Sequence, residues 1–197
     1  DLFLFSFAPF TPQRIAMLKK DHPQIQDLTT LAAFPIKLRG NAFKDGDLVG
    51  LNGANFVCVD PESFPRLVEM HFAQGDPATA VQQLAAGGHI FVTTDFYQAH
   101  GLGVGDQLHV LSAEGKPVTF TIAAVVSSTG MDLVKNYFDM RSTFQDAAVS
   151  TVMGSIDDAH KYFHQGDANL MLMNVTPQAQ QPAEMGKLRA ELQNEGF

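Results

Sequence analysis

The stretch that decides the fold is His89–Ser127, which reads HIFVTTDFYQAHGLGVGDQLHVLSAEGKPVTFTIAAVVS. It opens with the apolar run Ile90–Val92, which is too short for a helix and is rich in β-branched and aromatic residues. A short helix should follow, with Asp95 able to cap its start and Gly101 at its left-handed C-terminal end. We therefore expect a buried strand that leads directly into a short helix.

The second half of this stretch predicts a β-hairpin. Gly103–Asp106 should turn the chain into a strand at Gln107–Leu111, and Ala113–Lys116 should form the hairpin tip. The return strand, 118–126, alternates in polarity with a period of two. We expect it to have one apolar face, formed by Val118, Phe120, Ile122, Ala124 and Val126.

The order of these pieces resembles the extracytoplasmic domain of FtsX-like ABC transporter permeases of the MacB and LolC type. In that family a strand and a helix lead into a glycine-rich turn ending in Gly-Asp, and two strands then close on a Val-x-Gly-Val-Val phrase. Gly101–Asp106 and Ile122–Val126 hold those places here. Ala124 stands where glycine is usual. The resemblance is strongest over this stretch, and the flanks follow it more loosely.

The resemblance implies a non-catalytic domain on the periplasmic or extracellular side of the cell (inner) membrane. Transmembrane helices would then precede Asp1 and follow Phe197, and the chain, which lacks an initiator Met, would be a fragment. The implied partners are a cytoplasmic ABC ATPase subunit or domain and a second permease copy. A periplasmic adaptor and a lipoprotein or peptide cargo are further implied partners. ATP hydrolysis would drive movement or release of a substrate outside the membrane, which is mechanotransmission.

The flanking sequence predicts two strand-helix-strand halves around an insert. The fold class is therefore α+β, with a discontinuous, porter-like split βαβ subdomain and an inserted mixed α/β subdomain that contains the hairpin. We place the first subdomain at residues 1–60 plus 130–197 and the insert at 61–129. The elements expected outside the hairpin stretch are strands at 2–7, 25–38, 48–60, 147–153 and 169–175, and helices beginning at Pro12, Phe64, Pro77, Ser155 and Pro182.

Several finer expectations concern packing and ambiguous stretches. Ile15, Leu18 and Met17 should form the inward stripe of the first helix, and the helix at Phe64 should carry Met70 and Phe72. Residues 40–46 should form a surface turn, and the pattern of 131–144 favours no single element.

Composition excludes some classes of function. The 197 residues carry a net charge of −8, and clustered Lys and Arg that would bind a phosphate backbone are lacking, so nucleic acid is not an expected partner. No apolar run approaches the roughly 20 residues of a membrane-spanning helix. Cys58, the single cysteine, lies in an apolar strand and is expected to be a small buried hydrophobe.

Few residues in the sequence suggest a catalytic or binding role, and we predict no catalytic, cofactor-binding or metal-binding residue. Gly101, Gly103 and Gly105 could cradle a phosphate, but the cluster leaves a helix and enters a strand, which favours a plain turn. His160 and His164 would share a helix face with Asp157 one turn before. That trio could hold a metal ion or form an ordinary polar stripe.

Two other classes of function stay open on the sequence. The first is a stand-alone secreted α/β protein, either ligand-binding or a hydrolase, that uses the cleft between the subdomains. The second is a purely structural assembly module. A nucleophile elbow of the Gly-x-Ser-x-Gly type is absent from the sequence.

Overall fold

The computed structural model describes residues 2–5, 9–38, 53–127, 151–168 and 170–196. The chain divides into two compact units, each with its own set of internal contacts. Unit 1 comprises Asp1–Ala32 and Asp167–Phe197, and unit 2 comprises Ala33–Gly166. Strand β2 (Ile25–Leu38) contributes its first part to unit 1 and its last part to unit 2.

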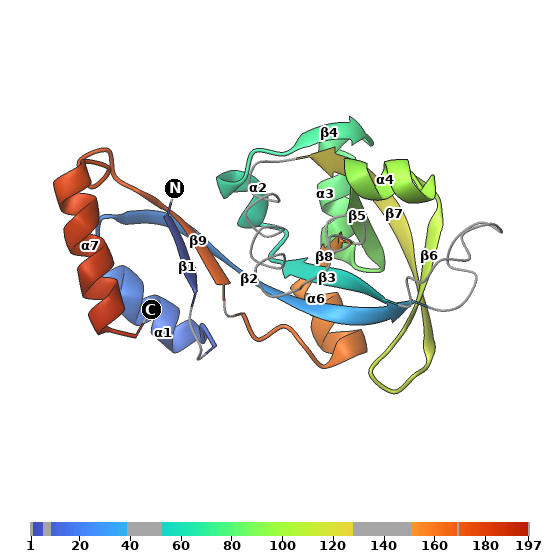
Figure 1. Cartoon of the computed structure of the whole chain (residues 1–197), viewed down its shortest axis with the longest axis horizontal. Helices are drawn as coiled ribbons and strands as arrows, with labels where there is room; N and C mark the ends of the chain where they lie inside the picture. Colours follow the sequence, from blue (N-terminus) through green and yellow to red (C-terminus); the bar gives the residue numbers. More distant parts are fainter. Residues whose placement is uncertain (1, 6–8, 39–52, 128–150, 169, 197) are drawn as a thin grey trace. The chain divides into compact units, whose positions relative to one another are not determined.

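Unit 1 is a split βαβ arrangement. Strand β9 pairs antiparallel with both β1 and β2, so β1 and β2 run parallel with β9 between them. Helix α1 connects the two parallel strands, and α7 follows β9 (Figure 1). The bounds are β1 (Leu2–Phe5), α1 (Pro12–Asp21), β9 (Leu170–Val175) and α7 (Pro182–Asn194).

The core of unit 1 is aliphatic and rich in methionine. Leu18 of α1 and Leu192 of α7 pack in one buried cluster with Met171 and Met173 of β9. The two methionines are two residues apart in a strand and therefore lie on the same face of the sheet. Both helices thus cover that face. Met17, which the sequence placed in the inward stripe, is instead 62% exposed because it lies off the Ile15 and Leu18 side of α1.

Unit 2 contains a mixed sheet whose strands follow the order β2-β3-β8-β5-β7-β4. The pairs β3/β8 and β5/β7 are parallel, whereas β8/β5 and β7/β4 are antiparallel. Strand β6 pairs antiparallel with both β7 and the end of β2. The elements are β3 (Gly53–Val59), α2 (Phe64–Leu67), β4 (His71–Gln74), α3 (Pro77–Ala86), β5 (His89–Thr93), α4 (Thr94–His100), β6 (Gln107–Leu111), β7 (Pro117–Ser127), β8 (Thr151–Ser155), α6 (Ile156–Asp158) and the π-helical turn η2 (Ala159–Phe163).

The predicted strand, helix and hairpin are confirmed as β5, α4, β6 and β7, with two corrections. The N-cap of α4 is Thr93, whose hydroxyl accepts from the Phe96 N–H at 3.0 Å, while Asp95 lies in the first turn. Strand β7 is buried on both faces in its second half, where Ala123 and Val125 are as inaccessible as their neighbours. The reason is its position between β5 and β4, with α3 and α4 in contact.

One predicted helix is shorter than expected. Helix α2 ends at Leu67, and Phe72 belongs to strand β4, which pairs with β7. Pairing with a long buried strand therefore overrides the weak helical spacing of these apolar residues. The expectations for 40–46 and 131–144 lie outside the described residues.

The compact units have different bounds from the subdomains expected at 1–60 plus 130–197 and at 61–129. Residues 33–60 and 151–166, which were expected in the first subdomain, group with unit 2. The pairing explains this grouping, because β3 pairs with β8 and β8 in turn pairs with β5.

A groove beside the hairpin tip as the candidate functional site

The glycine cluster after α4 is a turn held by local hydrogen bonds. Gly101 has φ +66 as the C-cap of α4, and Gly105 has φ +88. The Gly103 N–H donates to the Asp106 carboxylate at 2.8 Å, and the Gly105 N–H donates to the Ile122 carbonyl at 2.9 Å. These bonds direct the chain from α4 into β6. They give the cluster a structural role in the hairpin.

His160 and His164 are not brought together with Asp157 in a metal site. The chain from Ala159 to Phe163 forms a π-helical turn, and His164 follows it in the left-handed conformation with φ 54. His164 Nε2 contacts a carboxylate oxygen of Glu114 in the hairpin tip, whereas the His160 ring lies against Gly166. Among the described residues, no three His, Cys, Asp or Glu side chains are grouped closely enough to hold a metal ion.

The carboxylate of Glu114 makes two side-chain contacts at the hairpin tip. It accepts a hydrogen bond from the Ser112 hydroxyl at 2.8 Å and is also paired with His164. These two bonds, with that of Ser112 the larger, hold the pKa of the Glu114 carboxyl below its usual value of 4.5. The tip therefore keeps its charge to lower pH than an ordinary exposed glutamate would.

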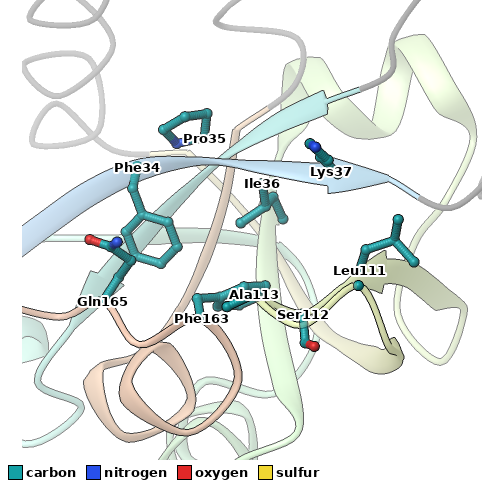
Figure 2. A pocket seen from close by; sticks show the side chains of 10 residues that line it. Phe34, Pro35, Ile36, Lys37, Leu111, Ser112, Ala113, Phe163 and Gln165 are labelled. Atoms are coloured by element: carbon teal, nitrogen blue, oxygen red, sulfur yellow. The ribbon is translucent and has the colours of Figure 1, made fainter.

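A groove of about 550 Å³ lies beside this tip. Its walls come from three separate segments of unit 2: the end of β2, the hairpin tip after β6, and the residues that close the π-helical turn (Figure 2). Phe34 and Ile36 point from β2 towards Ala113 and Phe163 (Figure 2). The lining residues are Phe34, Pro35, Ile36, Lys37, Leu111, Ser112, Ala113, Gly115, Phe163 and Gln165.

The floor of the groove is continuous with the aromatic core of unit 2. The ring centroid of Phe163 lies 5.2 Å from that of Phe56 and 5.5 Å from that of Phe34. The hairpin tip is fixed to the same segment, because the Ala113 N–H donates to the Tyr162 carbonyl at 3.0 Å. Two walls of the groove are thus held in place by backbone and ring contacts.

Sequence reasoning missed this groove because no local pattern marks it. Its three segments are separated by about 75 and about 50 residues of chain, and each alone is an ordinary strand end or turn. The nearest signals in the sequence are the hairpin tip and the His160/His164 pair, which lie about 50 residues apart in the chain. In the structure the Glu114–His164 contact joins them.

Two buried polar side chains were also missed. Asp158 is 3% exposed and accepts from the Gly88 N–H at 2.8 Å, so it ties α6 to the start of β5. In unit 1, His22 is 3% exposed, and its Nε2 lies 3.0 Å from a carboxylate oxygen of Glu195. The second ring nitrogen of His22 is 3.6 Å from Glu191. This histidine therefore connects the C-terminal ends of α1 and α7.

No family model and no curated protein sequence matches the chain. Solved structures do match. The extracellular domain of the noncanonic ABC-type transporter YknZ from Gram-positive bacteria has a TM-score of 0.59 and 10% identity, covering 99% of this chain and 94% of that one. The chain therefore has the fold of an ABC transporter ectodomain. The periplasmic region of MacB from Actinobacillus actinomycetemcomitans has a TM-score of 0.56 and 13% identity over 98% of this chain and 83% of that one.

A third similar structure is a domain of a protein from Porphyromonas gingivalis described as a permease. It has a TM-score of 0.51 and 12% identity over 98% of this chain and 71% of that one. These likenesses cover both units and bear out the predicted fold class. Within the part of the chain that the structure describes, no helix combines the length and apolar character needed to cross a membrane.

Proposed function

We propose that this chain is the non-catalytic extracytoplasmic domain of an ABC transporter permease. The observation that carries the proposal is the fold likeness to an extracellular and a periplasmic transporter domain over 98–99% of the chain. In this role the domain stands outside the membrane and responds to ATP hydrolysis by a cytoplasmic ATPase subunit or domain. Its movement acts on a substrate that is already outside the membrane.

The division into units supports a mechanical route. Both ends of the chain belong to unit 1, so unit 1 is the part that flanking transmembrane segments would move directly. The His22–Glu195 contact fastens the last turn of α7 to the end of α1. A displacement at the end of α7 therefore also moves α1, which packs into the core of unit 1.

The partners proposed for this role are the ATPase and a second copy of the permease. A periplasmic adaptor and a lipoprotein or peptide cargo are further proposed partners. The subdomain arrangement expected from the sequence is also kept as a proposal in its general form, a discontinuous unit that carries an insert. The contacts favour residues 33–166 as the bounds of that insert.

The side of the membrane on which the domain lies can be tested with a cysteine-labelling assay. Cys58 is 0% exposed, so the native chain gives little labelling. Replacing exposed Gln178 by Cys in the full-length protein places a reactive thiol on unit 1. We expect a membrane-impermeant maleimide to label intact spheroplasts. Labelling that requires lysis would contradict the proposal.

A further inference from the structure

The groove follows the backbone edge of β2. Successive residues of a strand point to opposite faces of a sheet. Figure 2 shows Phe34 and Ile36 on the face towards Ala113, and Pro35 and Lys37 on the other face, yet all four line the groove. A cavity lined by consecutive residues from both faces runs along the strand's edge, where the backbone hydrogen-bonding groups point.

The ladder between β2 and β6 stops at the start of the groove. Lys37 pairs with Leu111 in the antiparallel register, and the same register would place Ile36 opposite Ser112. Strand β6 ends at Leu111, however, and the Ala113 N–H donates to the Tyr162 carbonyl. The hairpin tip therefore turns away from β2, and the described residues provide no continuation of this ladder.

Pro35 lies two residues before the point at which the described β2/β6 ladder begins. Proline has no N–H to donate and is confined within sheets to edges and bulges. Proline is therefore compatible with the end of the β2/β6 ladder at this point, and β6 itself ends at Leu111. A chain that occupies the groove could continue the ladder along β2.

The two faces of the strand indicate which side chains such an occupant carries. On one face Phe34, Ile36 and Phe163 form an apolar surface. On the other face Lys37 is exposed, and no described carboxylate lies within 4 Å of its ammonium group. Opposite charges directly across two strands stabilise their pairing. The complementary occupant therefore alternates apolar and acidic residues.

We propose that this groove binds a short extended segment of a partner protein, with alternating apolar and acidic residues, as an added strand beside β2. Main-chain hydrogen bonds provide affinity in this mode of recognition, and alternate side chains provide specificity. The proposal goes beyond the transport role and does not depend on it, because it rests on the edge, the groove and the charge of unit 2 alone.

The test measures binding of a fluorescein-labelled Val-Glu-Val-Glu-Val-Glu peptide to the 197-residue chain by fluorescence anisotropy. We expect saturable binding that is abolished when alternate peptide amides are N-methylated, since added-strand pairing needs those donors. No binding, or equal binding of the N-methylated peptide, would overturn the proposal.

Three variants locate the site. Gln165→Trp fills the groove from an exposed position and should abolish binding, whereas Gln178→Trp, exposed on unit 1, should leave it unchanged. Lys37→Glu should weaken binding of the acidic peptide by about two- to fivefold and favour Val-Lys-Val-Lys-Val-Lys instead. Circular dichroism confirms that each variant is folded. Binding that Gln165→Trp leaves intact, or a Lys37→Glu variant with the original charge preference, would place the site elsewhere and overturn the proposal.

Discussion

The cores of the two units are built from different side chains. In unit 2 the rings of Phe56, Phe120 and Phe163 lie with their centroids 5.2–6.3 Å apart, and Phe34 joins them at the groove. Unit 1 instead packs leucine and methionine side chains from two helices onto one face of its sheet. Rigid rings interlock in few ways, whereas methionine adapts to its neighbours.

A glycine in β8 shows how closely the aromatic core is fitted. A Cβ at Gly154 would lie 2.1 Å from Cζ of Phe56, a contact that is impossible without displacing the ring. In unit 1, a Cβ at Gly186 of α7 would meet nothing within 4 Å. An added methyl group should therefore be costly at buried Gly154 and tolerated at exposed Gly186. The following predictions test how closely each part of the molecule is fitted, in order of decreasing effect.

The largest effect is expected from Phe56→Ala. Phe56 is 0% exposed and contacts three other aromatic rings, so truncation leaves a cavity that its neighbours cannot fill. We expect a loss of about 3–5 kcal/mol in the free energy of unfolding. Urea denaturation measures this loss of stability. Hydrogen exchange of the native protein should show reduced protection of the backbone amides in β3 and β8. Loss of protection confined to α1 and α7 would contradict the assignment of this core to unit 2.

Gly154→Ala should cost about 1–3 kcal/mol, because the added methyl overpacks the ring of Phe56. The double variant with Phe56→Leu, which removes the conflicting ring atoms, should lose less than the sum of the two single changes. The matched control is Gly186→Ala in α7, which should stabilise the helix by about 0.5–1 kcal/mol. Equal effects of the two glycine substitutions would contradict the close fit of Phe56 against Gly154.

His22→Gln tests the polar contact of unit 1. Loss of the 3.0 Å contact to Glu195 should cost about 1 kcal/mol and increase hydrogen exchange in the last turn of α7. Glu191 lies at 3.6 Å, beyond a good hydrogen bond, so Glu191→Gln should change the free energy of unfolding by less than about 0.5 kcal/mol. A larger loss of stability from Glu191→Gln than from His22→Gln would contradict the His22–Glu195 contact as the main polar contact between α1 and α7.

The smallest effect concerns pH and the hairpin tip. The pKa of Glu114 is lower in the folded chain than its usual value of 4.5, so its contribution to stability is present above that value and is lost as the pH falls through the folded pKa. Amide exchange at the tip should therefore increase in acid below about pH 4.5. Glu114→Gln should remove this pH dependence, and an unchanged acid response in that variant would rule out Glu114 as its source.

Local signals in the sequence predicted much of the fold. Pro12 after Thr11 and Pro77 after Asp76 begin α1 and α3 as expected, since both caps accept hydrogen bonds from the backbone. The bounds of β2 and β6 also match their predicted ranges. Caps and alternation are short-range features, so they can be read without knowing the rest of the fold.

What the sequence did not predict depends on contacts between distant residues. Strand β4 exists because it pairs with β7, and the groove exists because three distant segments meet. The buried environment of His22 likewise requires the end of α7, which lies 173 residues further along the chain. No local sequence pattern encodes contacts between such distant residues, which is why the candidate site emerged only from the structure.

The measurement that tests the proposed transport role most directly is the distance between two copies of unit 1 during the ATPase cycle. Spin labels at Gln178→Cys in the full-length permease, reconstituted with its ATPase, would be measured by pulsed electron paramagnetic resonance with and without ATP. We expect the distance distribution to shift when ATP binds, because the domain moves with the transmembrane segments. Identical distributions in both states would contradict a domain that transmits the energy of ATP hydrolysis.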